Sequence, residues 1–421
     1  MEGGACVPCG EPGSELSEQV KYTVIPGGVT APQGFLAAGI AAEVRKKGCR
    51  DLALLYSETP AVAAGLFTQN YVKAAPVLVS QEHLANGSAQ AVVVNSGIAN
   101  ACTGEQGLAD ARKMAQLTGD ALAVAPEDVI VASTGVIGEY LPMDKIEKGI
   151  KAAASLLSRD GGMFAAEAIL TTDTTTKEFA VKLTLAGKEV VIGGMAKGSG
   201  MIHPNMATML AFITTDANVE QNALNQALRW AVDRSFNSIT VDGDMSTNDM
   251  VVILANGQAG NDLLTEAGEE FELFRDVLLL VCTELAKMIA KDGEGASKLL
   301  EVQVKGAASE QEARLIAREI AGSSLVKTAL HGEDANWGRV MSAAGAAGVP
   351  FDPDKVDVYL GDLQVAAQGK AISFDEEQAN SILKESEVTI TVDLHSGNAS
   401  GIAWGCDLSY DYVRINAHYR T

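Results

Sequence analysis

The pattern of apolar and polar residues predicts strands and helices in no regular order. Short apolar runs bounded by turns predict strands, and apolar positions spaced by 3.6 residues predict helices. The predicted strands are 51–56, 90–95, 129–133, 182–185, 189–192, 251–254 and 388–393. The predicted helices are 108–124, 143–158, 219–235, 271–291, 310–321 and 337–347. Because these elements do not alternate as repeated βαβ units, we expect an α+β fold, a layered sandwich of mixed sheets and helices.

The composition is that of a globular protein with a substantial core. Hydrophobic residues make up 47% and charged residues 20% of the 421 positions. The strongest apolar run, 277–282, is followed by Thr283 and Glu284 and is far shorter than the roughly 20 residues that cross a membrane. Residues 1–20 lack the pattern of a signal or transit peptide, so we interpret them as a flexible leader.

The charge balance narrows the partners that we expect. The chain has 32 Lys and Arg against 54 Asp and Glu, a formal charge of −22, which argues against binding nucleic acid or an anionic membrane through the overall field. Six sparse cysteines fit a reducing, cytoplasmic location. Cys6 and Cys9 form a CxxC pair without a second pair, so no metal site is expected there.

The stretch 197–210, KGSGMIHPNMATML, contains the most informative chemistry. It places Ala207 directly before Thr208, with Lys197 at the start of a glycine-rich turn. A threonine hydroxyl becomes an effective nucleophile when the peptide bond before it is cut, because the freed α-amino group then acts as the adjacent base. A nearby lysine charge would lower the pKa of that amine.

This stretch resembles the self-cleaving site of the ornithine acetyltransferase (glutamate N-acetyltransferase) family, and the resemblance covers nearly the whole chain. It implies cleavage between Ala207 and Thr208, giving an alpha fragment, 21–207, and a beta fragment, 208–421, that share one fold. It also implies that Thr134 and Gly135 form the oxyanion hole. The resemblance implies these substrate-binding residues: Thr174, Lys197, Thr208, Glu294, Asn416 and Thr421.

Three further segments look like family signatures. Residues 95–104 end a predicted strand and are interpreted as either a site-facing edge or a tight turn, and Ile98 stands where many relatives have a polar residue. Residues 241–249 and 331–339 are interpreted as structural or site-supporting. The aspartates of 241–249 lack EF-hand spacing, so no metal is expected there. His203 is close to Thr208 in the sequence, but no motif marks it as a catalytic base.

The resemblance implies an enzyme of arginine biosynthesis that carries acetyl on Thr208. It would move acetyl from N-acetylornithine to glutamate by ping-pong kinetics, without a cofactor, as a heterotetramer of two alpha and two beta fragments. Whether acetyl-CoA also serves as donor is left open. A self-processing aminopeptidase or amidase, in which water resolves the acyl-enzyme, is the alternative enzyme. A non-enzymatic binding protein is the alternative of another class.

Overall fold

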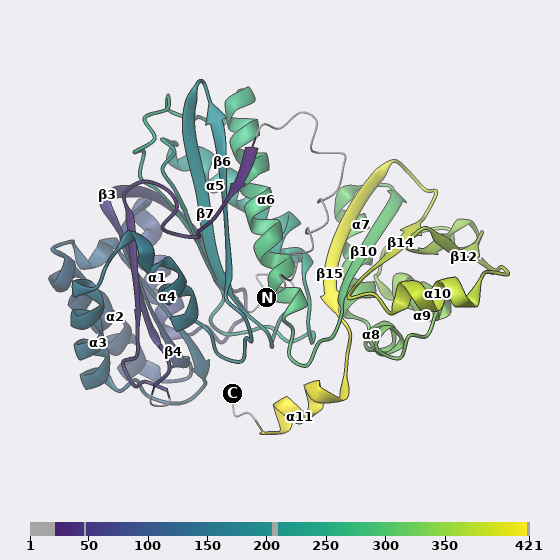
Figure 1. Ribbon diagram of the computed structural model, residues 1–421, viewed down its shortest axis with the longest axis horizontal. Helices are drawn as coiled ribbons and strands as arrows, with labels where there is room; N and C mark the ends of the chain where they lie inside the picture. Colours follow the sequence, from purple (N-terminus) through teal and green to yellow (C-terminus); the bar gives the residue numbers. More distant parts are fainter. Residues whose placement is uncertain (1–21, 46–47, 204–208, 419–421) are drawn as a thin grey trace, which may run out of the picture.

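The computed structural model describes residues 22–45, 48–203 and 209–418, and it shows a mixed α+β fold (Figure 1). The expected fold class is therefore confirmed. The strands are β1 (Tyr22–Ile25), β2 (Phe35–Ile40), β3 (Leu52–Phe67), β4 (Ser88–Ile98), β5 (Val129–Val136), β6 (Lys177–Leu185), β7 (Lys188–Lys197), β8 (Leu210–Thr215), β9 (Met250–Ala255), β10 (Leu299–Ala307), β11 (Asp357–Leu360), β12 (Leu363–Ala367), β13 (Lys370–Ala371), β14 (Glu387–Asp393) and β15 (Ala399–Cys406). The helices are α1 (Ala75–His83), α2 (Gly104–Leu122), α3 (Met143–Ser155), α4 (Gly162–Ala168), α5 (Gln221–Arg234), α6 (Glu269–Lys291), α7 (Glu310–Gly322), α8 (Ser324–His331), α9 (Trp337–Ala346), α10 (Glu376–Leu383) and α11 (Tyr410–His418).

A long bent strand organises the larger of two sheets. In the described part of the chain, nine strands follow the order β1-β6-β7-β8-β9-β3-β4-β5, with β2 beside β3. Residues 52–56 of β3 pair with β2 and β4, whereas residues 62–67 pair with β9. The register between β3 and β4 shifts between Tyr56 and Ala61, which lets the sheet fold over into two packed layers.

Successive residues of β4 and β8 are buried in different cores, which shows how these layers are covered. Val92 of β4 and Phe212 of β8 lie in one core between the two strand layers. The next residue of each strand points the opposite way, because successive side chains of a strand alternate between its faces. Val93 packs with α1, α2 and α3, and Ile213 packs with α5 and α6. The result is a four-layer arrangement of helix, sheet, sheet and helix.

The larger sheet contains strands from both sides of residue 208. β7 pairs antiparallel with β8, which in turn pairs parallel with β9. This confirms that the two predicted fragments share one fold. The division of the chain between residues 207 and 208 stays a prediction, and the leader 1–20 lies outside the described residues.

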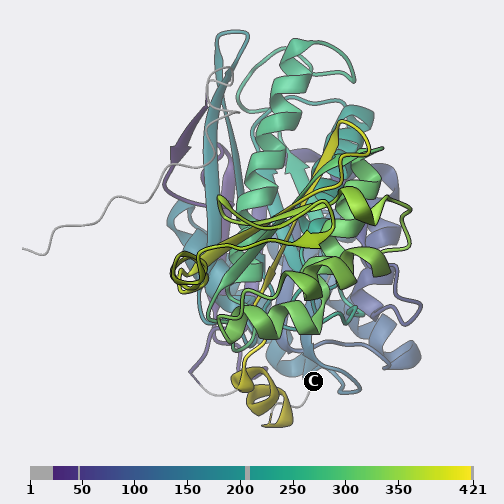
Figure 2. The same ribbon diagram turned by 90° about the vertical axis from the view of Figure 1, so that its right-hand side faces the viewer.

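A smaller sheet and the C-terminal helix complete the molecule. In the described residues, six strands follow the order β13-β12-β11-β14-β10-β15, and α7 to α10 pack on this sheet around a separate core. Figure 2 shows this unit in front of the four-layer part. After β15 the chain reaches α11, which lies below the rest of the molecule in both views and carries Asn416 back toward the larger sheet.

Candidate active site

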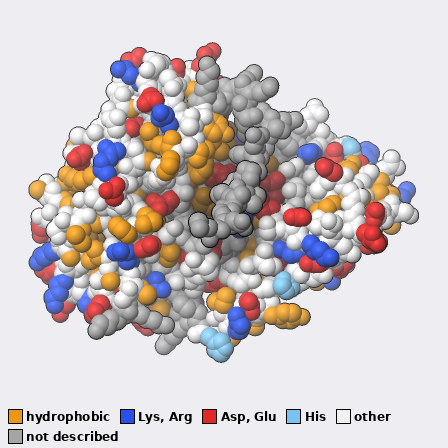
Figure 3. All heavy atoms as spheres, viewed as in Figure 1, with side chains coloured by type: hydrophobic (Ala, Val, Ile, Leu, Met, Phe, Trp, Pro, Cys, Tyr) orange, Lys and Arg blue, Asp and Glu red, His pale blue; other side chains and the backbone are white. Residues whose placement is uncertain are grey.

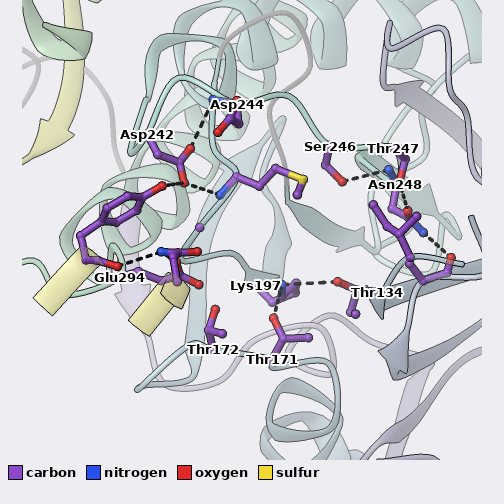
Figure 4. Close-up of a pocket in the computed structure, with 17 residues that line it drawn as sticks. Thr134, Thr171, Thr172, Lys197, Asp242, Asp244, Ser246, Thr247, Asn248 and Glu294 are labelled. Carbon is purple, nitrogen blue, oxygen red and sulfur yellow. Dashed lines mark hydrogen bonds between the residues drawn. The ribbon is translucent and has the colours of Figure 1, made fainter. Parts of the chain in front are cut away.

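A cavity of about 170 Å³ gathers residues from the strand ends of the larger sheet, from the loop before β9 and from α11 (Figure 4). It is lined by Ala99, Thr134, Gly135, Ile137, Thr171, Thr172, Lys197, Gly200, Met201, Asp242, Asp244, Ser246, Thr247, Asn248, Glu294, Tyr412 and Asn416. Five of the residues predicted from the sequence are in this set: Thr134, Gly135, Lys197, Glu294 and Asn416.

Thr134 and Gly135 stand near the end of β5, beside the end of β4. Gly135 has a φ of 129°, and a Cβ on it would lie 2.2 Å from the carbonyl carbon of Gly97. A side chain at this position would therefore push the two strands apart. The close approach explains why glycine follows the pocket-facing threonine.

Lys197 is the last residue of β7, and its side chain is almost fully buried. Its Nζ donates to Thr171 Oγ1 at 2.8 Å and to Thr134 Oγ1 at 3.5 Å. Asp173 Oδ2 lies 3.7 Å from the same nitrogen. Burial lowers the pKa of Lys197, and the carboxylate of Asp173 opposes this shift. The ammonium thus sits between the predicted oxyanion residue and a hydroxyl that lines the cavity.

A buried network of ion pairs lies next to Lys197. Lys177 Nζ lies 2.8 Å from Asp173 Oδ1 and 2.6 Å from Asp292 Oδ2. Burial alone would raise the pKa of Asp173, but Lys197, Lys177 and the backbone N–H of Gly198 outweigh it and hold that pKa well below its usual range. Asp173 is therefore ionised at neutral pH and ties β7 to the loop before β6.

The structure places Thr174 in this network and not on the cavity. Its hydroxyl donates to Asp292 Oδ1, and its backbone N–H donates to Asp292 Oδ2 at 3.0 Å. Two earlier threonines of the same segment, Thr171 and Thr172, line the cavity instead. The sequence identified the hydroxyl-rich segment, but consecutive threonines gave no signal of which one faces inward.

Glu294 and Asn416 are 122 residues apart in the sequence and meet in the pocket. Glu294 is buried after the end of α6, and its Oε2 accepts from Asn416 Nδ2 at 2.8 Å. A Cβ on Gly200 would lie 2.5 Å from this carboxylate, so Gly200 leaves the space that Glu294 occupies. The glycine-rich turn after β7 thereby accommodates an acidic side chain.

The segment 241–249 contributes more to the pocket than the sequence indicated. Asp242 accepts from the backbone N–H groups of Met201 at 2.6 Å and Ile202 at 2.8 Å, and from the hydroxyl of Tyr412 at 3.2 Å. Burial raises the pKa of Asp242, although these backbone donors oppose the shift. Asn248 Nδ2 donates to the carbonyls of Ala99 and Ser133, at 2.7 and 2.8 Å, and so joins the ends of β4 and β5.

The predicted cleavage residues Ala207 and Thr208, and the predicted substrate residue Thr421, lie outside the described residues. Met209 is the first described residue after Thr208, and its backbone N–H donates to Asp249 Oδ1 at 3.0 Å. Lys197 at the end of β7 pairs with Leu210 at the start of β8. The strands before and after residues 198–209 therefore lie side by side, next to the cavity that Lys197 lines. His203 faces Thr240 Oγ1 at 3.5 Å and does not line the cavity.

The remaining signature segments have defined contacts. Residues 95–104 fit both interpretations, because Asn100 Nδ2 donates to the Gly107 carbonyl at 2.9 Å and Ala99 lines the cavity. His331 Nδ1 is 2.7 Å from Asp407 Oδ2, away from the cavity-lining residues. Among the described residues, the structure shows no His, Cys, Asp and Glu grouping that suits a metal ion. No helix in the described part of the chain is long and apolar enough to cross a membrane.

Comparisons of the sequence with known proteins identify a family. Residues 36–421 match the ArgJ family. The chain belongs to this family. It is 57% identical over 399 residues to an arginine biosynthesis bifunctional protein ArgJ of Symbiobacterium thermophilum, covering 94% of this chain and 99% of that protein. The corresponding protein of Caldanaerobacter subterraneus subsp. tengcongensis is 52% identical over 402 residues, covering 94% of this chain and 100% of that protein.

A solved structure also matches part of the chain. The crystal structure of an ornithine acetyltransferase from Mycobacterium tuberculosis complexed with ornithine is 42% identical in sequence. The match covers 44% of this ArgJ-family chain and 99% of the solved chain, with a TM-score of 0.41.

Proposed function

We propose that this ArgJ-family protein is a self-processing N-acetyltransferase of arginine biosynthesis that moves acetyl from N-acetylornithine to glutamate. Full-length relatives named arginine biosynthesis bifunctional protein ArgJ support this activity. The structural observation that carries the proposal is the meeting of Thr134, Gly135 and Lys197 beside the strands that flank residue 208.

The proposed maturation uses the hydroxyl of Thr208 against the preceding peptide bond. Thr208 Oγ attacks the carbonyl carbon of Ala207, the C–N bond breaks, and an ester between the two residues forms as the nitrogen takes up the hydroxyl proton. Water then hydrolyses the ester. This releases the carboxylate of Ala207 and frees the α-amine of Thr208, which serves as base for the later acetyl transfers.

The acetyl transfer has two half-reactions. Thr208 Oγ attacks the acetyl carbonyl of N-acetylornithine, ornithine leaves with a proton on its α-nitrogen, and acetyl-Thr208 remains. The α-amine of glutamate then attacks the acetyl-enzyme, which releases N-acetylglutamate. In both steps Thr134 and the backbone of Gly135 stabilise the oxyanion, since preorganised donors act on charge that develops only in the transition state.

Further residues complete the proposed substrate site. Lys197 pairs with the α-carboxylate of either substrate, and Glu294, Asn416 and Thr421 bind the remainder. We assign the substrate contact to Thr171 instead of Thr174, because Thr171 lines the cavity and the hydroxyl of Thr174 is bonded to Asp292. The proposed active form is cytoplasmic and contains two alpha and two beta fragments.

The intact mass of the purified protein under denaturing conditions, measured beside that of Thr208→Ala, tests the proposal. We expect two wild-type fragments, the second beginning at Thr208, and a single chain for the variant. A wild-type chain that stays whole contradicts the mechanism.

Incubation with N-acetylornithine and glutamate separates the two enzyme classes, because a transferase accumulates N-acetylglutamate and an amidase accumulates acetate. Parallel initial-velocity lines support the acetyl-enzyme, and product from acetyl-CoA and glutamate would add a second donor.

A further inference from the structure

The cavity has an acidic end and a reactive end. Figure 4 shows Asp242, Asp244 and Glu294 on one side, and Lys197 with Thr134 on the other. These three acids and one lysine are the charged side chains that line the cavity in the described part of the chain. Because Asp173 lies 3.7 Å from Lys197 and compensates its charge, the cavity as a whole favours a ligand that carries a cation.

Two of the three carboxylates already have protein partners. The oxygens of Asp242 accept from the backbone of Met201 and Ile202 and from the hydroxyl of Tyr412, which makes Asp242 a structural connection between the turn after β7 and α11. Glu294 accepts from Asn416. Neither carboxylate is left entirely for a ligand.

Asp244 differs from both. Its backbone N–H donates to Asp242 Oδ1 at 3.3 Å, which fixes the position of the residue at the cavity wall. Its side chain lines the cavity and is exposed, and its carboxylate accepts no hydrogen bond and forms no ion pair within residues 22–45, 48–203 and 209–418. Asp244 is thus a carboxylate at the acidic end of the cavity whose backbone is fixed and whose oxygens have no partner in the described part of the chain.

We infer that Asp244 is a specificity-determining residue that receives the distal ammonium of the donor N-acetylornithine. The inference rests on the proposed function and extends it. With the acetyl group beside Thr134 and Gly135 and the α-carboxylate toward Lys197, the side chain of the donor points to the acidic end. The acceptor glutamate carries a carboxylate at the corresponding end of its side chain. The same Asp244 charge therefore attracts the first substrate and repels the second.

Steady-state kinetics of Asp244→Asn separates this role from a structural one. In a ping-pong reaction, kcat/KM for each substrate reports the half-reaction of that substrate. We expect kcat/KM for N-acetylornithine to fall about fivefold, the size of an exposed ion pair, and kcat/KM for glutamate to rise about twofold or more. Asp242→Asn should lower both values together. The matched control is Asp362→Asn, an exposed carboxylate at the turn between β11 and β12, which should change neither.

A substrate analogue tests the contact directly. N-acetylnorvaline keeps the carbon chain of N-acetylornithine and lacks the ammonium, so wild type should discriminate against it and Asp244→Asn should lose about fivefold of that discrimination. The inference is overturned if Asp244→Asn changes kcat/KM for N-acetylornithine and for glutamate in the same direction, or changes neither. A wild-type protein that transfers no acetyl from N-acetylornithine to glutamate would instead contradict the proposed function, before any variant is compared.

Discussion

Gly135 and Gly97 are in backbone contact at the point where β5 and β4 reach the cavity. The Cβ of any other residue at position 135 would lie 2.2 Å from Gly97 C and 2.4 Å from Gly97 O. This contact holds the Thr134–Gly135 peptide, which we propose as the oxyanion hole, at the edge of the cavity. The strand order, more than the local Thr-Gly dipeptide, therefore determines the geometry of the reactive end.

Gly135→Ala should reduce acetyl transfer by about 100-fold or more, because the added methyl displaces a donor of the oxyanion hole. Gly138→Ala is the matched control. Its φ of 83° is also positive, but a Cβ there meets no atom within 4 Å. Rates and thermal unfolding of both variants check the prediction. Equal losses of activity in the two variants would point to backbone strain and not to the Gly97 contact.

Thr171→Val and Thr174→Val should affect different properties. Thr171 Oγ1 is bonded to Lys197 Nζ and lines the cavity, so its loss should lower kcat/KM by about tenfold. The hydroxyl of Thr174 is bonded to Asp292, so its loss should lower the melting temperature and leave kcat/KM nearly unchanged. A larger kinetic defect in the Thr174 variant would restore the assignment made from the sequence.

Asp173→Asn should destabilise the protein strongly. Asp173 lies between the ammonium groups of Lys177 and Lys197, and removing its charge leaves both cations buried with weaker compensation. Breaking such a pair costs about 3–5 kcal/mol, which chemical denaturation would detect. Glu147→Gln is the matched control, because Glu147 pairs with Lys151 on the surface of α3 and its loss should leave the unfolding midpoint nearly unchanged. Similar midpoints for the two variants would contradict a stabilising role of the network.

The stability of the protein should depend on the titration of Asp249. Its side chain is buried, and burial raises its pKa well above the usual value of 3.8. The native state therefore holds this proton more tightly than the unfolded state. The resulting stabilisation is complete below about pH 4 and is lost as pH rises through the folded pKa.

Asp249→Asn removes this titration and keeps the shape of the side chain. The melting temperature of the variant, relative to that of wild type, should therefore increase as pH rises from about 4 to 8. Melting curves at matched ionic strength across this range measure the difference. A difference that stays constant with pH would show that Asp249 does not couple to folding in this way.

Tyr412→Phe should loosen α11 with little effect on global stability. In the described part of α11 no residue is fully buried, so the bonds of Tyr412 to Asp242 and of Asn416 to Glu294 hold it in place. Loss of one such bond costs about 0.5–1.5 kcal/mol of docking free energy. We expect KM to rise more than kcat falls, with faster proteolysis within residues 410–418. Unchanged proteolysis would contradict this role of Tyr412.

The net negative charge of the chain does not show where its acidic side chains lie on the molecule. Figure 3 shows acidic and basic side chains interspersed over the face that it displays. The acidic excess that matters for the proposed chemistry is local, at Asp242, Asp244 and Glu294 in the cavity. The net charge of −22 alone gave no indication of this placement, since a summed charge carries no position.

The sequence alone determined the α+β class, the main helices and strands, and the residues whose chemistry is unusual for their position. Local periodicity is enough for elements such as α6 and β14, because each buries its own apolar face. It missed several elements, among them β8, β10, β15, α1, α8 and α11. β8 is only six residues long, and α11 has no buried residue. Only the tertiary structure decided that Thr171 and not Thr174 faces the cavity, and that the carboxylate of Asp244 has no partner among the residues that the structure describes. These outcomes depend on strand pairing and on contacts between distant segments, such as Glu294 with Asn416, which no local pattern records.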